Sequence, residues 1–194
     1  RGAGVSKVAL AYARSNIPSV DRDKDDFYPT PPAATRALLQ VEQFSGPIWE
    51  PACGDGAICS MLSESGHQVI ATDLNDHGFG ESRIDFLMEQ NLLAPNIITN
   101  PPYKNAESFL HKSLNLGAKK VAFLLRLAWL EGIERKAIFE STPLARVHVA
   151  SRRISMQRGG TDGGNGGGSM IAFAWFVWDV KHSGPPSLSW FDWK

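Results

Sequence analysis

The sequence lacks long hydrophobic runs and contains little cysteine. Its longest apolar runs, such as residues 121–125, are far too short to span a bilayer, and its first residues show no signal-peptide pattern. The two cysteines, Cys53 and Cys59, have no histidine-rich partner segment, so we expect neither a metal site nor a disulfide framework. These absences favour a cytoplasmic protein without membrane contacts.

The sequence also lacks net charge and any internal repeat. Its 20 Lys and Arg residues balance 20 Asp and Glu residues, so no overall field attracts a polyanion. Nucleic-acid binding would therefore need a local basic patch. A hydrophobic content of 43% and a charged content of 21% over 194 residues are typical of a globular domain with a sizeable core. Nothing in the composition defines an oligomeric state.

Composition shifts divide the chain into three parts. Residues 1–26 have the loose spacing of a helix followed by a run of alternating charges, which is typical of a solvated linker. Residues 27–183 form the main domain. The tryptophan-rich tail, residues 184–194, either packs over that domain or provides a contact surface.

Within the main domain, β-prone segments alternate with helical ones. We expect strands at 48–50, 67–72, 84–87, 97–100, 120–127, 145–150 and 170–180, and helices at 33–40, 57–64, 106–116 and 131–140. This alternation predicts an α/β fold with a doubly wound, seven-stranded, mostly parallel sheet and an antiparallel closing hairpin. Ligands of such sheets bind beyond the carboxyl ends of the strands.

A glycine turn follows the first expected strand. Gly54 and Gly56 permit positive φ and let the backbone approach a ligand closely. The position of the third glycine of a dinucleotide fingerprint is Cys59, and Glu50 ends the strand, so a pyrophosphate is a poor ligand. A cationic or zwitterionic nucleoside fits this acidic turn better. Asp73, about twenty residues further on, is placed to accept hydrogen bonds from a ribose diol.

Two other segments permit either a binding or a purely structural interpretation. Asp85 could bond an adenine amine and Phe86 could pack on its ring, or Phe86 could simply belong to the core with Asp85 at the surface. Thr30 is a candidate N-cap followed by Pro31 in the first helical turn. Tyr28 and Thr30 could also present an aromatic face and polar groups to a ligand beside the sheet.

The segment Asn100-Pro101-Pro102-Tyr103 ends the fourth expected strand. The prolines forbid continuation of the strand and hold Asn100 extended. The result is a rigid tip that carries an amide, proline carbonyls and an aromatic ring. A planar group with an exocyclic amine could stack on Tyr103 while it donates to the Asn100 oxygen and the Pro101 carbonyl. The alternative is an ordinary strand end with Tyr103 partly buried.

A basic stretch leads into a glycine-rich loop. Residues 126–158 contain seven Lys and Arg against three Glu, although the whole chain is neutral. Arg152, Arg153 and Arg158 flank the loop, where residues 159–168 include seven glycines. The loop is either a long flexible hairpin connection or a segment that orders on nucleic acid.

Residues 26–180 resemble class I S-adenosylmethionine-dependent methyltransferases that methylate amino groups, specifically the N6-adenine DNA methyltransferases. The most specific parts are Glu50-Pro-Ala-Cys-Gly-Asp-Gly56 and the NPPY motif Asn100-Pro-Pro-Tyr103, in that order. The segment 27–30 looks like the one that completes the cofactor pocket of this family. In one group of this family the target-recognition part comes last in the chain, and the loop 158–169 occupies a similar position. The resemblance implies a Rossmann-like fold.

The resemblance also implies an activity. S-adenosyl-L-methionine would be the cofactor, and the acceptor would be the N6 amino group of adenine in DNA, with RNA also open as a partner. Asn100 and Pro101 would accept hydrogen bonds from the amine within a tetrapeptide completed by Pro102, and Tyr103 would stack on the base. The implied cofactor-binding residues are Tyr28, Pro29, Thr30, Glu50, Pro51, Ala52, Gly54, Gly56, Asp73, Leu74, Asp85 and Phe86.

The same residues permit other functions. The same tetrapeptide serves methyltransferases of ribosomal or transfer RNA and of a protein glutamine amide, and the basic stretch favours a nucleic acid over a protein. A non-catalytic nucleic-acid-binding partner would be expected to lose the tetrapeptide or the glycine turn, and both are intact. A nicotinamide-dependent oxidoreductase is disfavoured by the missing third glycine.

Overall fold

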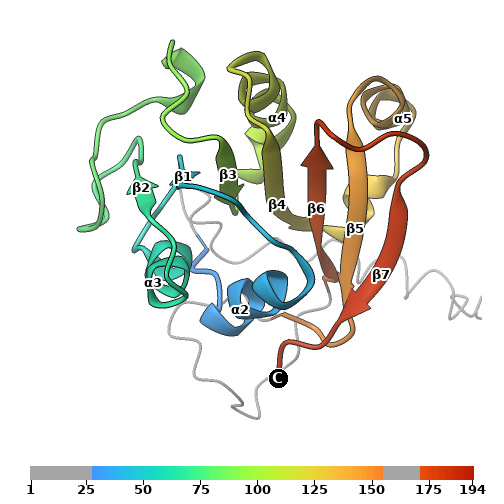
Figure 1. The fold of residues 1–194 in the computed structure, drawn as a ribbon, viewed down its shortest axis with the longest axis horizontal. Coiled ribbons are helices and arrows are strands. Elements are labelled where there is room, and N and C mark those ends of the chain that lie inside the picture. The colour runs from blue at the N-terminus through green and yellow to red at the C-terminus, as the bar shows by residue number, and fades with distance from the viewer. Residues whose placement is uncertain (1–27, 155–170) are drawn as a thin grey trace, which may run out of the picture.

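A computed structural model of the chain describes residues 28–154 and 171–194 (Figure 1). The elements are α2 (Pro32–Val41), β1 (Ile48–Glu50), α3 (Ala57–Glu64), β2 (Val69–Ala71), η1 (Phe86–Met88), β3 (Asn96–Thr99), η2 (Tyr103–Asn105), α4 (Ala106–Asn115), β4 (Lys120–Arg126), η3 (Leu127–Leu130), α5 (Ile133–Ser141), β5 (Leu144–Ala150), β6 (Phe173–Asp179) and β7 (Ser187–Phe191), where η marks a 3₁₀ helix. The helix predicted within residues 1–26 and the glycine-rich loop 158–169 lie outside the described residues.

The described strands form one seven-stranded sheet in the order β2-β1-β3-β4-β6-β5-β7. Strands β1 to β4 run parallel to one another, β6 lies antiparallel between β4 and β5, and β7 runs parallel to β5. The predicted α/β doubly wound sheet, mostly parallel with an antiparallel pair at β5 and β6, is therefore confirmed.

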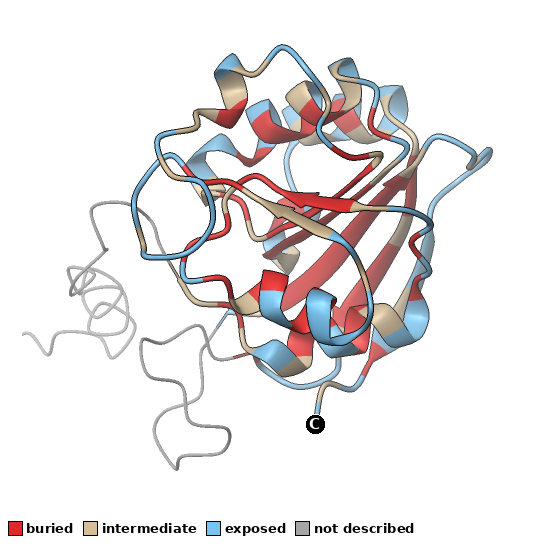
Figure 2. Cartoon of the chain, turned by 60° about the vertical axis from the view of Figure 1, so that its left-hand side comes forward, coloured by how far each residue is buried: buried red, intermediate tan, exposed pale blue. Residues whose placement is uncertain are grey.

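Helices cover both faces of the sheet, and the strands between them are largely buried (Figure 2). Alternation of side chains along each strand explains these two layers. In β3, for example, Ile97 packs with α4 on one face and Ile98 packs with α2 and α3 on the other. The side chains of β4 alternate in the same way. Phe123 lies in the hydrophobic core on the face that α4 covers, and Leu124 lies in the core on the face that α2 and α3 cover.

Two expected elements differ in the structure. The third strand predicted at 84–87 does not form, because the Asp85 side chain accepts a hydrogen bond from the Leu87 amide and starts the 3₁₀ helix η1. The seventh strand of the sheet comes instead from the tail, where β7 pairs with β5. Helix α2 begins at Pro32 with Pro31 in the N-cap position, so Thr30 is not the predicted cap. The Thr30 side chain is instead buried.

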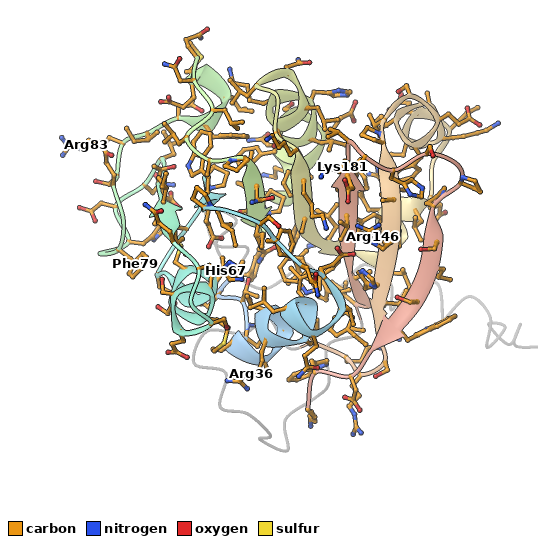
Figure 3. The ribbon with its side chains drawn as sticks, in the orientation of Figure 1. Arg36, His67, Phe79, Arg83, Arg146 and Lys181 are labelled. Carbon is orange, nitrogen blue, oxygen red and sulfur yellow. The ribbon has the colours of Figure 1, made fainter. Side chains whose placement is uncertain are left out.

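A buried carboxylate ties the end of α2 to the sheet. Glu42 accepts hydrogen bonds from Lys120 of β4 at 3.0 Å, from His148 of β5 at 2.9 Å and from Arg146, which lies among the strands in Figure 3. Burial alone would raise the pKa of Glu42, but these hydrogen bonds outweigh it and lower the pKa to about 2. The carboxylate therefore stays ionised and stabilises the docking of α2.

Candidate functional site

Three polar residues meet at one rim of the sheet. Glu50 ends β1, Asp73 lies just beyond β2, and Asn100 follows β3 directly. Because β2, β1 and β3 are neighbouring parallel strands, their carboxyl ends lie at the same edge. The structure thus places these three predicted site residues at one edge, as the sequence suggested.

A cavity of about 380 Å³ opens at this rim. Its lining brings together eight predicted residues from four separate segments: Pro51, Ala52, Asp73, Leu74, Asp85, Phe86 and, from the tetrapeptide, Asn100 and Pro102. Its volume lies at the lower end of the range for small-molecule pockets. Carboxylates, an amide and an aromatic ring face this space, so it can accept a nucleoside by both hydrogen bonding and packing.

A second, smaller cavity of about 30 Å³ lies beside the first. Tyr28, Pro29, Thr30 and Glu50 line it, together with residues of the glycine turn. Ala52 and Asn100 line both cavities. The segment before α2 therefore does reach the rim, and Asn100 stands where the two spaces meet.

In the Asn100 side chain, the amide nitrogen is hydrogen-bonded and the amide oxygen has no described partner. Its amide Nδ2 donates to the backbone oxygen of Tyr28 at 3.2 Å, which fixes the orientation of the amide. Its Oδ1 atom is buried and accepts no hydrogen bond from any described residue. A buried acceptor of this kind is costly unless a ligand supplies a donor, so Asn100 is suited to hold an N–H group.

The two predicted glycines shape the turn without lining either cavity. The Gly54 amide donates to Asp73 Oδ2 at 2.8 Å, which joins the turn to the acid after β2. Gly56 has a φ of 83°, and a Cβ atom there would lie 2.4 Å from the ring of Phe79. Phe79 lies at the edge of the molecule near α3 (Figure 3). The space that Gly56 leaves open is thus filled by the protein's own side chain.

Asp73 and Asp85 already accept backbone hydrogen bonds. The second oxygen of Asp73 accepts from the Asn75 amide at 2.8 Å, so both carboxylate oxygens help to hold the loops around the cavity. Each oxygen retains a lone pair for a ligand hydroxyl. Phe86 is part of the core, where its ring contacts Trp49, and it also lines the cavity. Phe86 is therefore a core residue that also forms part of the cavity wall, and its packing on an adenine ring stays a prediction.

Glu50 is completely buried behind the smaller cavity. Burial raises its pKa well above the usual range, and the Cys59 thiol lies 3.2 Å from its Oε2 atom. Burial also raises the pKa of the Cys53 thiol to about 12, and that of Cys59 further. Both thiols are consequently protonated and poor nucleophiles. No cluster that could hold a metal ion occurs within residues 28–154 and 171–194.

Tyr103 lies beside the site, in contact with other side chains. It lines neither cavity. Its ring stacks near that of Tyr28, with centroids 6.4 Å apart and planes 20° apart, and the Arg126 guanidinium carbon lies over it at 4.7 Å from the centroid. Phe173 approaches at 6.2 Å. The aromatic tip expected from the sequence is thus partly covered.

Of the predicted basic residues, Arg152 has a defined partner. Its Nε atom donates to both carboxylate oxygens of Asp192 at 3.0 and 3.1 Å, in an exposed ion pair between the end of β5 and the chain after β7. Arg153 is exposed at the same strand end, and Arg158 lies outside the described residues. An exposed pair such as Arg152 and Asp192 is weak, so a phosphate could compete for the arginine.

Several residues near the site were not predicted. The large cavity is also lined by Asn75, His77, Ile84, Leu87, Lys104, Asn105 and Phe109. Lys104 and Asn105 directly follow the tetrapeptide, so their proximity in sequence was an available signal. Arg126 had no such signal, because it reaches Tyr103 from the end of the neighbouring strand β4.

No family model matches the sequence, and no curated protein matches it. Among solved structures, a protein from Pyrococcus horikoshii assigned as an RNA methyltransferase superposes with a TM-score of 0.61 at 16% identity, covering 90% of this chain and 98% of that one. A modification subunit assigned to a type I restriction enzyme of Vibrio vulnificus gives 0.56 at 15% identity over 96% of this chain, which spans 50% of the subunit.

A third structure carries a bound cofactor. Magnesium protoporphyrin IX methyltransferase from Synechocystis, with S-adenosylmethionine bound, gives a TM-score of 0.50 at 11% identity over 75% of each chain. The chain thus has the Rossmann-like fold that these methyltransferases share. Since the three proteins are named for different activities, the fold alone does not define the acceptor. No helix in the described ranges is long and apolar enough to cross a membrane.

Proposed function

We propose that this protein is an S-adenosylmethionine-dependent methyltransferase that acts on the N6 amino group of adenine in DNA. The observation that carries the proposal is the Asn100 amide. Its oxygen is buried without a partner among the described residues, at the junction of two cavities on the carboxyl edge of the sheet. An exocyclic amine is a donor that such an oxygen can bind.

The two cavities suit the two ends of the cofactor. Asp73 would bind the ribose hydroxyls, and Asp85 and Phe86 would contact the adenine ring in the larger cavity. The ammonium end of the amino acid part would point toward the smaller cavity, between Tyr28 and Glu50. No described cation pairs with the buried Glu50, so an ammonium group there would favour its ionised form. When bound, the cofactor supplies an electrophilic methyl group on a sulfonium.

The chain's own residues would orient and activate the acceptor. The Asn100 oxygen and the Pro101 carbonyl accept hydrogen bonds from the amine, which raises the electron density on its nitrogen. Tyr28 holds the Asn100 amide in place through its backbone oxygen. Alignment of the reacting groups in a partly buried site is the main catalytic contribution, and it can be worth about 7–11 kcal/mol. Tyr103 stacks on the base, and a base within a duplex must first be flipped out.

Methylation of RNA is the second candidate, favoured by the likeness to the Pyrococcus protein. The preference for a nucleic acid over a protein amide rests on the basic residues at the ends of β4 and β5, Arg126, Arg152 and Arg153. Because the fold is shared by enzymes with different acceptors, the acceptor has to be identified directly. Labelling of a panel of acceptors separates these possibilities.

The test is incubation with radiolabelled S-adenosylmethionine and a panel of DNA, RNA and protein, followed by nucleoside analysis of the labelled material. We expect N6-methyladenosine in its deoxy form. Asn100→Ala should lower turnover by about 100-fold or more, as does loss of a comparable group in other sites, with cofactor affinity nearly unchanged. Asn91→Ala, at an exposed loop position, is the matched control and should have no effect. Full turnover by Asn100→Ala would remove Asn100 from its role.

A further inference from the structure

Arg126 is an arginine at the candidate site to which the proposed function gives no individual role. It is the last residue of β4, directly opposite Phe173 of β6 in the sheet register. Strand β4 is the neighbour of β3, which leads into Asn100. The guanidinium carbon lies 4.7 Å from the centre of the Tyr103 ring. Arg126 therefore stands at the same rim as the tetrapeptide, against the aromatic residue proposed to stack on the target base.

The hydrogen-bonding capacity of Arg126 is not used within the described residues. Its Nε atom is buried and has no hydrogen-bond partner in residues 28–154 and 171–194, and no described carboxylate forms an ion pair with it. Arg146 and Arg152, by contrast, are each paired with a carboxylate. A buried guanidinium N–H without an acceptor is unfavourable, so a ligand that brings an anionic acceptor to this position would be bound favourably.

We propose that Arg126 binds the phosphodiester group beside the target adenine while the base is held at Tyr103. The inference rests on the proposed function, since it takes DNA as the substrate. A guanidinium can stack on an aromatic face and at the same time present a fork of N–H donors to phosphate oxygens. Arg126 would thus fix the sugar-phosphate of the target nucleotide and leave recognition of the amine to Asn100. The alternative is that Arg126 only packs on Tyr103.

The test compares Arg126→Gln and Arg126→Lys with Arg135→Gln. Arg135 is the matched control, because its guanidinium also lies over an aromatic ring, that of Trp129 at 5.6 Å, but it already donates hydrogen bonds to backbone oxygens. DNA affinity is measured between about 50 and 200 mM salt, with cofactor affinity and thermal midpoint alongside. Loss of one phosphate contact should weaken binding by about tenfold at low salt and reduce the salt slope by about 1 in Arg126→Gln.

In Arg126→Lys the charge remains, so the salt slope should stay while the affinity falls. Arg135→Gln should change neither, and all three variants should bind the cofactor as the wild type does. A substrate experiment keeps the protein unchanged: in an oligonucleotide with a single adenine, the phosphate beside that adenine is replaced by a neutral methylphosphonate. The replacement should weaken wild-type binding as much as Arg126→Gln does, and should not weaken that variant further.

The outcomes separate this inference from the proposed function. If wild-type protein methylates DNA, but both Arg126→Gln and the neutral linkage leave affinity and salt slope unchanged, Arg126 is a packing residue and the inference alone is overturned. If Arg126→Gln does not fold, the test is the binding of wild-type protein to the oligonucleotide with the neutral linkage, and unweakened binding would overturn the inference. If the wild type neither binds nor methylates any polynucleotide, the proposed function and this inference are both wrong.

Discussion

Replacing Glu42 by Gln removes the charge that holds α2 to the sheet, and the size of its effect can be worked out from the structure. Burial disfavours the carboxylate, but hydrogen bonds from His148, Arg146 and Lys120 lower its pKa from 4.5 to about 2. At about 1.4 kcal/mol per pH unit, this difference corresponds to roughly 3 kcal/mol of the free energy of unfolding. The Glu42 side chain is only 3% exposed, so solvent screening reduces this value little.

The sign of the pH dependence follows from the lowered pKa. Because the folded pKa is the lower one, the stabilisation is complete above pH 4.5 and is lost as the pH falls toward 2. Glu42→Gln should therefore be less stable than wild type by roughly 3 kcal/mol at neutral pH, and the loss can be larger because three cationic or hydrogen-bonding partners remain. Near pH 3.3 the difference should shrink to about half.

Urea denaturation followed by tryptophan fluorescence measures this difference, since Trp175 and Trp178 are fully buried. Asp192→Asn is the control: its carboxylate forms an exposed ion pair with Arg152, so solvent screening should leave stability almost unchanged at both pH values. A Glu42→Gln difference that is equally large at neutral pH and near pH 3.3, or one that is negligible at both, would refute the assignment of the pH effect to Glu42.

Three further outcomes are expected at the site. Gly56→Ala should destabilise the fold by about 1–3 kcal/mol more than Gly66→Ala in urea denaturation, because both glycines have positive φ but only the first meets the Phe79 ring; equal effects would exclude a role for that contact. Asp73→Asn should weaken cofactor binding by roughly tenfold in calorimetry, since the carboxylate both holds the glycine turn and faces the cavity; unaltered affinity would place the ribose elsewhere. Cys53, with its pKa raised to about 12 by burial, should resist a thiol reagent at about pH 8 until the protein unfolds, and rapid modification of native protein would contradict its burial.

The sequence was enough to predict an edge of the sheet for the candidate site, because the relevant signals are local. A strand that ends in Glu50, or that stops at two prolines after Asn100, places its last residue at the carboxyl edge of a parallel sheet whatever the rest of the chain does. The alternation of strands and helices determined the layered fold for the same reason. The prediction failed at residues 84–87, where one side-chain hydrogen bond from Asp85 was enough to replace a short strand by a 3₁₀ turn.

The contacts between distant segments, by contrast, follow from the packing of the folded chain. Arg126 reaches Tyr103 from a neighbouring strand, and Glu42 meets Arg146 across 104 positions of sequence. The tail becomes a strand because the edge of β5 is free to pair with it, and Phe79 fills the space that Gly56 leaves. Each of these contacts joins segments that are distant along the chain, so it depends on the packing of the whole sheet, and no local pattern of residue types encodes it.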